Sequence, residues 1–134
     1  MEATMTERRI APRVVKTATL KDGTDVEIRN MRPGDVESSY SFFSSLPEED
    51  RRYLRADVTR RDVVERRTTE LDSGRVDRLV AVAGDEIIAD GTLELQGHGW
   101  GDNIGELRLI VARPYQHLRL GTMLARELYY LAMQ

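Results

Sequence analysis

The chain has 134 residues, of which 40% are hydrophobic and 32% are charged, and its formal net charge is -3. This length suits one domain with its own core, and the small negative charge gives no support to a nucleic-acid-binding role. The sequence contains no cysteine, which excludes disulfides, thiolate metal sites and cysteine nucleophiles.

The start of the chain is polar and is interrupted by Pro12, which predicts a flexible tail over residues 1–12 ahead of one domain over 13–134. No segment is typical of a membrane span or a secretory signal. Charged residues break up the first stretch: Glu2, Glu7, Arg8, Arg9 and Arg13. We therefore expect a cytoplasmic protein with no membrane partner.

Two short strands are predicted over residues 14–20 and 25–31, on either side of an Asp-Gly turn at residues 22 and 23. A helix should follow, with Asp35 as its cap and one apolar face. That face would carry Val36, Tyr40 and Phe43.

A second helix is expected from Pro47 to just before Asp72, with Leu54, Val58 and Val64 on its buried side. Its many arginines are interleaved with acidic residues at spacings of three and four. This pattern predicts a solvated, ion-paired face, with a basic docking surface as the alternative.

Strand periodicity returns over residues 79–83 and 86–95, which predicts a second hairpin with Gly91 as a bulge or a point of close approach. The glycines that follow are interleaved with His98 and Trp100. They precede a strand and therefore do not match a dinucleotide fingerprint, so we interpret residues 97–101 as a loop.

The last part of the chain predicts a strand over 106–111, a turn that contains Pro114, and a final helix. The helix has one apolar face, formed by Leu120, Met123, Leu124, Leu128 and Leu131. A turn of this kind gathers amide N–H groups and the positive end of the helix dipole, so it can bind a phosphate. An ordinary strand-to-helix connection is the alternative interpretation. The predicted order of elements favours an α/β (α+β) sandwich with a mostly antiparallel sheet flanked by helices.

Three passages of the sequence resemble the GNAT superfamily of acyl-CoA-dependent N-acyltransferases, and within it the GNAT domains of bacterial protein lysine acetyltransferases. They are residues 21–29 with 32–35, residues 79–82, and residues 106–111 leading into 115–122. The last passage aligns without a gap to the coenzyme A signature of the family. That signature is Gln or Arg, two residues, Gly, one residue, then Gly or Ala. The resemblance covers about residues 24–134 and implies the GNAT fold.

The resemblance implies that acetyl-CoA binds along this last passage, as the acyl donor and without a metal. Backbone groups at the strand end would meet the pantetheine arm, from Leu109, Ile110 and Val111. Main-chain N–H groups of the loop would wrap the pyrophosphate, from Gln116, His117, Leu118, Arg119, Leu120, Gly121 and Thr122. A diphosphate needs several converging amides, which agrees with this placement.

Arg119 stands where the family signature has its first glycine. If the position requires a positive φ or a close approach of the backbone to phosphate, a side chain there costs about 1 kcal/mol and could crowd the ligand. The arginine could instead add charge to the pyrophosphate site. Both interpretations follow from the sequence.

Glu106 matches the strand glutamate of similar lysine acetyltransferase domains, and it could accept the proton of the amine. A solvent-facing strand acid is the alternative. A backbone N–H near Val111 could polarise the thioester carbonyl. His117, His98 and Trp100 are more consistent with loop surfaces, Tyr129 and Tyr130 with packing or partner contact, and two isolated histidines do not form a metal site.

GNAT domains normally continue beyond this helix, and their usual thiolate-protonating tyrosine lies in that continuation. The resemblance therefore implies a domain truncated after the helix, with an open sheet edge that could pair in a homodimer. Two functions follow. One is acyl-CoA-dependent N-acyltransferase, or the cofactor-binding half of one, acting on a small-molecule amine or a protein lysine. The other is a non-catalytic dimerising or regulatory module with a degenerate acyl-CoA site.

Overall fold

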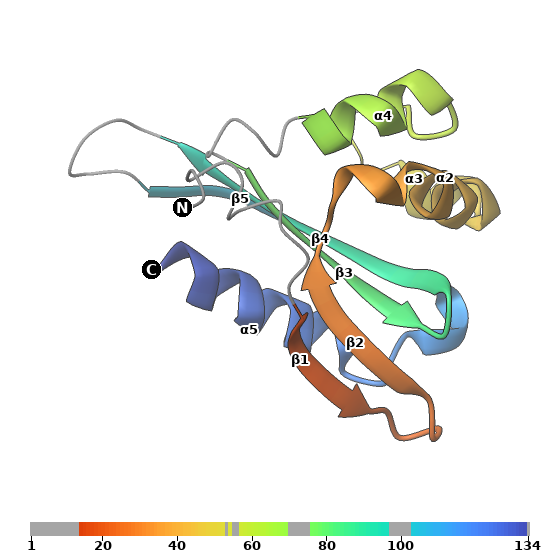
Figure 1. Ribbon diagram of the computed structural model, residues 1–134, viewed down its shortest axis with the longest axis vertical. Helices are drawn as coiled ribbons and strands as arrows, with labels where there is room; N and C mark the ends of the chain where they lie inside the picture. The colour runs from red at the N-terminus through yellow and green to blue at the C-terminus, as the bar shows by residue number, and fades with distance from the viewer. Residues whose placement is uncertain (1–13, 53, 55–56, 70–75, 97–102, 134) are drawn as a thin grey trace, which may run out of the picture.

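The computed structural model describes residues 14–52, 54, 57–69, 76–96 and 103–133 (Figure 1). Over these residues the chain forms a five-stranded antiparallel sheet whose strands neighbour one another in chain order. The strands are β1 (Val14–Thr19), β2 (Asp25–Asn30), β3 (Val76–Ala83), β4 (Glu86–Gln96) and β5 (Asn103–Val111). The predicted tail and the loop with His98 and Trp100 lie outside the described residues.

Helices cover both faces of the sheet, as Figure 1 shows. One layer contains η1 (Pro33–Asp35), α2 (Val36–Ser45), α3 (Glu48–Arg51) and α4 (Arg61–Thr69). On the opposite face lies α5 (Leu120–Ala132), which follows η3 (Arg113–Tyr115). The predicted α+β sandwich with an antiparallel sheet is confirmed. In the described part of the chain, no helix is long and apolar enough to cross a membrane.

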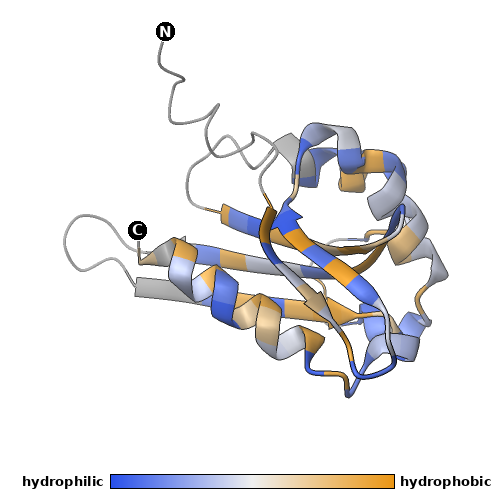
Figure 2. Cartoon of the chain, turned by 60° about the horizontal axis from the view of Figure 1, so that its bottom comes forward, coloured by the Kyte–Doolittle hydropathy of each residue, from blue (hydrophilic) through white to orange (hydrophobic). Residues whose placement is uncertain are grey.

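The hairpin of β1 and β2 forms because the strands alternate apolar and polar residues around a glycine turn. Val26 and Ile28 of β2 are buried while Glu27 between them is exposed. Figure 2 shows this alternation as orange and blue bands along the strands. Gly23 has a φ of +91°, a left-handed conformation that other residues adopt at a cost. The prediction of a hairpin at this turn is confirmed.

The larger core lies between the sheet and α5. Leu120, Leu124 and Leu128 repeat every four residues, and all three are at most 1% exposed. They pack against the buried apolar residues of the sheet, which include Leu79, Ala81, Ala89 and Leu93. The predicted apolar face of the final helix is therefore confirmed, and its burial is the main force that fixes α5 on the sheet.

The second core fills the space between the sheet and the layer of α2 and α4. Phe43 is fully buried and its ring meets that of Phe42 edge to face, with the centroids 5.1 Å apart. The other buried members come from separate segments and include Met31, Val58, Val64, Val80 and Ile87. Val58, Val64 and the partly buried Leu54 lie on the buried side, as the sequence predicts.

The prediction of one continuous helix from Pro47 is wrong. α3 ends at Arg51, and α4 begins only at Arg61. Between them Asp57 accepts hydrogen bonds from the N–H and the hydroxyl of Thr59, and its carbonyl accepts the N–H of Arg60 at 3.1 Å. Side chains of this type compete with helical hydrogen bonds for the backbone, so the chain turns here.

Asp35 lies at the N-cap position of α2 but makes no capping bond with its side chain. Its carboxylate instead accepts hydrogen bonds from both terminal nitrogens of Arg29, at 2.8 and 2.9 Å, and from the N–H of Arg32 at 2.9 Å. The prediction that the Asp35 side chain caps this helix is therefore wrong. This buried carboxylate joins the end of β2 to the start of the helical layer.

Candidate functional site

The strand, turn and helix at the end of the chain enclose a surface hollow of about 350 Å³, which we call the loop hollow. β5 ends at Val111, η3 follows, and residues 116–119 turn into α5. The hollow is lined by Val111, Tyr115, Gln116, His117, Arg119, Leu120, Gly121 and Thr122. All of these except Tyr115 belong to the set predicted to meet coenzyme A, so seven residues of that set line one surface, while Leu109, Ile110 and Leu118 do not line it.

Two residues of the loop adopt left-handed backbone conformations. His117 has a φ of +67° and Arg119 a φ of +68°, and within the described residues these are the non-glycine positions with a positive φ. Left-handed backbone costs about 1 kcal/mol for a residue with a side chain. Arg119, which stands where the family signature has glycine, therefore adopts the backbone conformation that glycine adopts most readily.

The start of α5 presents hydrogen-bond donors to the loop hollow. The first N–H groups of a helix have no partner within the helix, and the Arg119 side chain makes no capping bond. The Arg119 side chain is exposed, and no carboxylate of the described residues pairs with it. Free amides, the helix dipole and an exposed cation are groups that can hold a phosphate.

Backbone groups at the outer edge of β5 adjoin this hollow. The N–H of Ala112 donates to Ile88 of β4 at 2.9 Å, and antiparallel hydrogen bonds alternate along a strand. The backbone groups of Val111 and Leu109 therefore point away from β4, whereas those of Ile110 point toward it. The side-chain amide of Gln116 donates to the Val111 carbonyl at 3.0 Å. Among the three strand residues predicted to meet the coenzyme, Leu109 and Val111 are therefore the ones whose backbone groups face the open edge of β5.

Leu118 and Ile110, also predicted to meet the coenzyme, lie outside the loop hollow. Leu118 packs against the core under α5. Ile110 packs with the core on the other face and lines a second cavity, together with Leu109. Their contact with a coenzyme stays a prediction.

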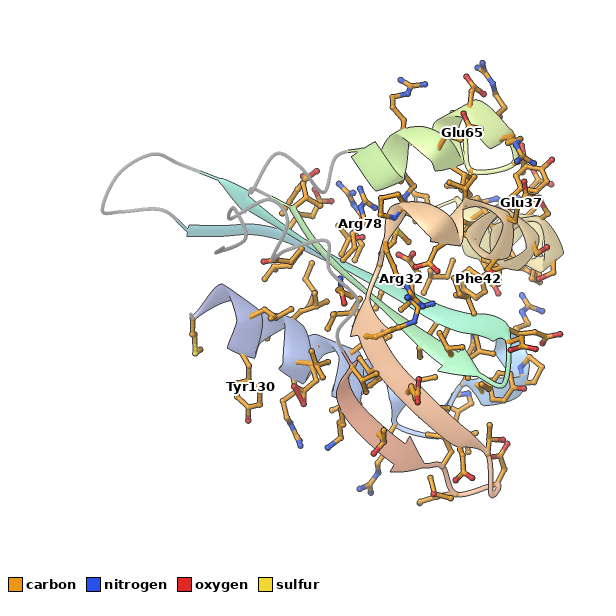
Figure 3. All side chains as sticks on the ribbon, viewed as in Figure 1. Arg32, Glu37, Phe42, Glu65, Arg78 and Tyr130 are labelled. Atoms are coloured by element: carbon orange, nitrogen blue, oxygen red, sulfur yellow. The ribbon has the colours of Figure 1, made fainter. Side chains whose placement is uncertain are left out.

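The second cavity, which we call the β4–β5 cavity, has a volume of about 240 Å³. It lies on the face of the sheet that the layer of α2 and α4 covers. Its lining is Leu54, Val58, Arg67, Arg78, Asp90, Thr92, Glu94, Arg108, Leu109 and Ile110. Figure 3 labels Arg78, whose side chain lies between the sheet and the helical layer.

A buried ion pair forms one end of this cavity. Arg67 of α4 donates to Asp90 of β4 at 3.2 and 3.0 Å, and Asp90 is 3% exposed. The Arg67 guanidinium also lies 4.7 Å from the centre of the Phe43 ring. The prediction of a solvated, ion-paired face for the arginine-rich segment is wrong for Arg67, which is buried. Its spacing of three and four residues from Val64 and Val63 is the signal that marks the buried face.

Glu106, the predicted catalytic residue, lies on β5 directly opposite Glu94 of β4. Its carboxylate accepts hydrogen bonds from the guanidinium of Arg108, at 3.1 and 2.7 Å. The same guanidinium approaches Glu94 at 3.9 Å. Asp90, Thr92 and Glu94 are not among the residues predicted for the site, although polar residues at every second position of a strand indicate a polar strip on one face.

The other candidates lie apart from both cavities or outside the described residues. Tyr129 and Tyr130 are exposed on α5, and Figure 3 shows Tyr130 pointing away from the sheet. In the part of the chain that the structure describes, no group of three or more potential metal ligands is found. Arg113 of η3 donates to Asp50 and Glu49 of α3, and hydrogen bonds to Asp50 and then to Glu49 raise the pKa of its guanidinium above the usual value.

No protein-family model and no curated protein sequence matches the chain, whereas solved structures do. The GNAT domain of PAT from S. lividans is 21% identical, with a TM-score of 0.71, and the match covers 88% of this chain and 71% of that one. A GNAT-family acetyltransferase from Streptococcus pneumoniae is 17% identical, with a TM-score of 0.60 over 81% of this chain and 67% of that one.

A third match is the PaiA N-acetyltransferase of Thermoplasma acidophilum, which was solved in complex with coenzyme A. It is 15% identical, with a TM-score of 0.59, and the match covers 79% of this chain and 70% of that one. These identities support a statement about architecture, which agrees with the element order and the sheet described above. The chain therefore has the fold of the GNAT acetyltransferases.

Proposed function

We propose that this protein is an acyl-CoA-dependent N-acyltransferase, or the cofactor-binding half of one. The observation that carries the proposal is the loop hollow, in which most of the predicted coenzyme residues line one surface at the start of α5. A similar fold holds coenzyme A in the PaiA enzyme. Cytoplasmic residence belongs to the same proposal.

In this proposal the pyrophosphate of the coenzyme occupies the loop hollow. The N–H groups at the start of α5 bind the phosphate oxygens, and the exposed Arg119 adds a positive charge. The structure favours this role for Arg119 over crowding. The Arg119 backbone already has the left-handed conformation that glycine adopts most readily, and the side chain is at the surface.

The pantetheine arm then runs along the outer edge of β5. The backbone groups of Val111 and Leu109 face this edge, and an extended arm can hydrogen-bond to them as an added strand would. Glu106 lies five positions before Val111, a distance of about 17 Å along the strand. The pantetheine arm must follow β5 over this distance to bring the thioester near Glu106.

The chemistry requires a deprotonated amine. The Glu106 carboxylate takes one proton from the acceptor ammonium, and the free amine attacks the thioester carbonyl. A C–N bond forms and the C–S bond breaks. The second amine proton leaves with the collapse of the tetrahedral intermediate, and the coenzyme thiolate is protonated to the thiol. The acceptor in this proposal is a primary amine, either a small molecule or a protein lysine. The β4–β5 cavity offers aliphatic walls and the carboxylates of Asp90 and Glu94, which lie beside the arginines of the same lining.

Isothermal titration with acetyl-CoA tests this function. We expect saturable binding, and we expect Arg119→Gln to weaken it by about fivefold, the effect of one charge-assisted contact at an exposed site. Arg126→Gln is the matched control, because Arg126 is an exposed arginine of the same helix outside the hollow. Absence of binding at millimolar acetyl-CoA would refute the function, and tighter binding by the Arg119 variant would support crowding instead.

A second function is favoured by the outer edge of β5, which pairs with no other strand of the described residues. An open edge is a template for strand addition. Two large apolar side chains at the end of the final helix are also exposed, Tyr130 at 54% and the C-cap residue Met133 at 78%. The chain could therefore act as a dimerising or regulatory module. Light scattering over a range of protein concentrations tests this second function, because a constant monomer mass excludes a module that acts by dimerising.

A further inference from the structure

Glu94 and Glu106 lie directly opposite each other on neighbouring antiparallel strands. Glu94 lines the β4–β5 cavity, on the face that the layer of α2 and α4 covers. Like charges in this position repel and destabilise a sheet unless a cation lies between them. The two side chains are partly exposed, at 32% and 30%, so solvent and solutes can reach them. The pair therefore requires a cation that is held by the fold or supplied from outside.

Arg108 supplies that cation. Its Nε and Nη2 atoms donate to the two oxygens of Glu106, at 3.1 and 2.7 Å, which fixes the plane of the carboxylate. Its Nη2 atom also lies 3.9 Å from an oxygen of Glu94. One guanidinium thus bridges both carboxylates, and Arg108 itself is 21% exposed. The ion pair is accessible enough to open.

The surroundings of this bridge suit an alkyl chain. Glu94 and Arg108 line the β4–β5 cavity, whose other walls include the aliphatic side chains of Leu54, Val58 and Ile110. Asp90 at the opposite end is already paired with Arg67. A ligand with a short aliphatic stem and a terminal positive charge can place its stem on the aliphatic wall and its charge near Glu94 and Glu106.

We propose that Arg108 is a positioning residue for Glu106, and that an incoming alkylammonium group takes its place between Glu94 and Glu106. This inference rests on the proposed acyltransferase function and names the acceptor class as an unbranched primary alkylamine. Arg108 orients the base while the cavity is empty. When the acceptor binds, its ammonium replaces the guanidinium at Glu106, and Glu106 then takes one proton from it.

Arg108 is consequently an internal competitor of the acceptor. Removal of its charge should strengthen the binding of an alkylammonium ion, whereas loss of a residue with a purely structural role would weaken or not affect it. Removal of the Glu94 carboxylate should weaken binding, because the ammonium loses one of its two anionic partners. These opposite signs distinguish positioning from a structural role.

The experiment is an NMR titration of the isotope-labelled chain with n-butylammonium chloride, with n-butanol as the neutral control. We expect saturable shifts of the Arg108 Nε–H and of the Glu94 and Glu106 amides with the ammonium alone. Glu94→Gln should weaken the affinity and Arg108→Gln should strengthen it, each by about fivefold, as for an exposed charge pair. Arg108→Lys, which keeps a cation, should restore the wild-type affinity.

Arg113→Gln is the matched control, because Arg113 also bridges two carboxylates but lies on the surface outside the cavity. This variant should bind n-butylammonium as the wild type does. The inference is overturned if the wild type shows no saturable shift, if n-butanol produces the same shifts, or if Arg108→Gln weakens binding. Should Arg108→Gln fail to fold, Glu94→Gln and Arg108→Lys decide between the outcomes. If Glu94→Gln binds n-butylammonium as tightly as the wild type does, the inference is overturned.

Titration of the same samples with acetyl-CoA separates the two proposals. If acetyl-CoA binds in the loop hollow while n-butylammonium does not shift the Arg108, Glu94 and Glu106 signals, the acyltransferase proposal stands and the role of Arg108 is refuted. If the ammonium binds between the carboxylates and acetyl-CoA does not bind, the acyltransferase proposal fails and an alkylammonium site remains.

Discussion

Gly91 of β4 and Leu128 of α5 lie so close together that a Cβ atom at Gly91 would be 3.0 Å from Leu128 Cδ1. It would also lie 3.1 Å from Leu109 Cδ2. Gly91 has no positive φ, so the close approach of α5, and not the backbone conformation, explains why glycine occupies this position. The predicted role of Gly91 as a point of close approach is confirmed.

Gly91→Ala should therefore destabilise the protein by about 1–2 kcal/mol, as overpacking in a core does. Denaturant unfolding measures this change. Gly34→Ala is the control, because a Cβ atom there meets nothing within 4 Å. It should leave stability unchanged or raise it by about 0.5 kcal/mol through a less flexible unfolded chain. Equal stabilities of the two variants would contradict the contact.

Arg119→Gly should stabilise the free protein by about 0.5–1 kcal/mol, because glycine adopts the φ of +68° without steric cost. His117→Gly should behave in the same way, since His117 has nearly the same φ. Arg126→Gly, within the regular part of α5, should instead destabilise by about 1 kcal/mol. Thermal unfolding of the three variants checks the signs, and a loss of stability in Arg119→Gly would show that its conformation is not strained.

Arg67→Met should destabilise the protein by about 3 kcal/mol, because it leaves the carboxylate of the buried Asp90 without its cation. The double variant Arg67→Met, Asp90→Leu should recover much of this loss, since both charges are then absent. Unfolding free energies in a double-mutant cycle give the coupling. The exposed pair of Arg60 and Asp62 is the control and should contribute less than about 0.5 kcal/mol.

Asp57 should make the stability depend on pH in acid. The hydroxyl of Thr59 and then its N–H donate to the Asp57 carboxylate, and these bonds lower the pKa of Asp57 below its ordinary value of 3.8. A group with a lowered pKa in the folded state stabilises the fold above 3.8 and loses this effect as the pH falls through the folded-state pKa.

Asp57→Ala should consequently destabilise more at neutral pH than in acid, as measured by unfolding at several pH values. Thr59→Ala removes the larger of the two hydrogen bonds and should abolish most of the same pH dependence. A constant difference between wild type and Asp57→Ala across this range would refute the assignment.

The periodicity of apolar residues correctly predicted those helices and strands that form from one continuous stretch of sequence. The face of α5 and the hairpin at Gly23 are examples, because their residues alternate at the period of their own structure. The break between α3 and α4 was missed because residues 48–69 favour helix throughout. A local bond between Asp57 and Thr59 decides the chain direction there.

The loop hollow and the β4–β5 cavity also differ in how far the sequence could predict them. The residues of the loop hollow are nearly contiguous in sequence, so a motif could identify them. The contacts of Arg67 with Asp90 and of Arg108 with Glu94 depend on strand register and on the placement of a helix. A single sequence does not specify these tertiary arrangements by pattern alone.

The contact of Arg113 with Glu49 and Asp50 joins η3, which precedes the loop hollow, to α3 in the opposite helical layer. The raised pKa of Arg113 keeps the guanidinium charged wherever the protein is folded. Arg113 and Glu49 are more than half exposed, so added salt weakens their contact, whereas the contact with Asp50, which is 18% exposed, is screened less. High salt should therefore loosen the connection between η3 and α3 without removing it, and mild alkali leaves it intact.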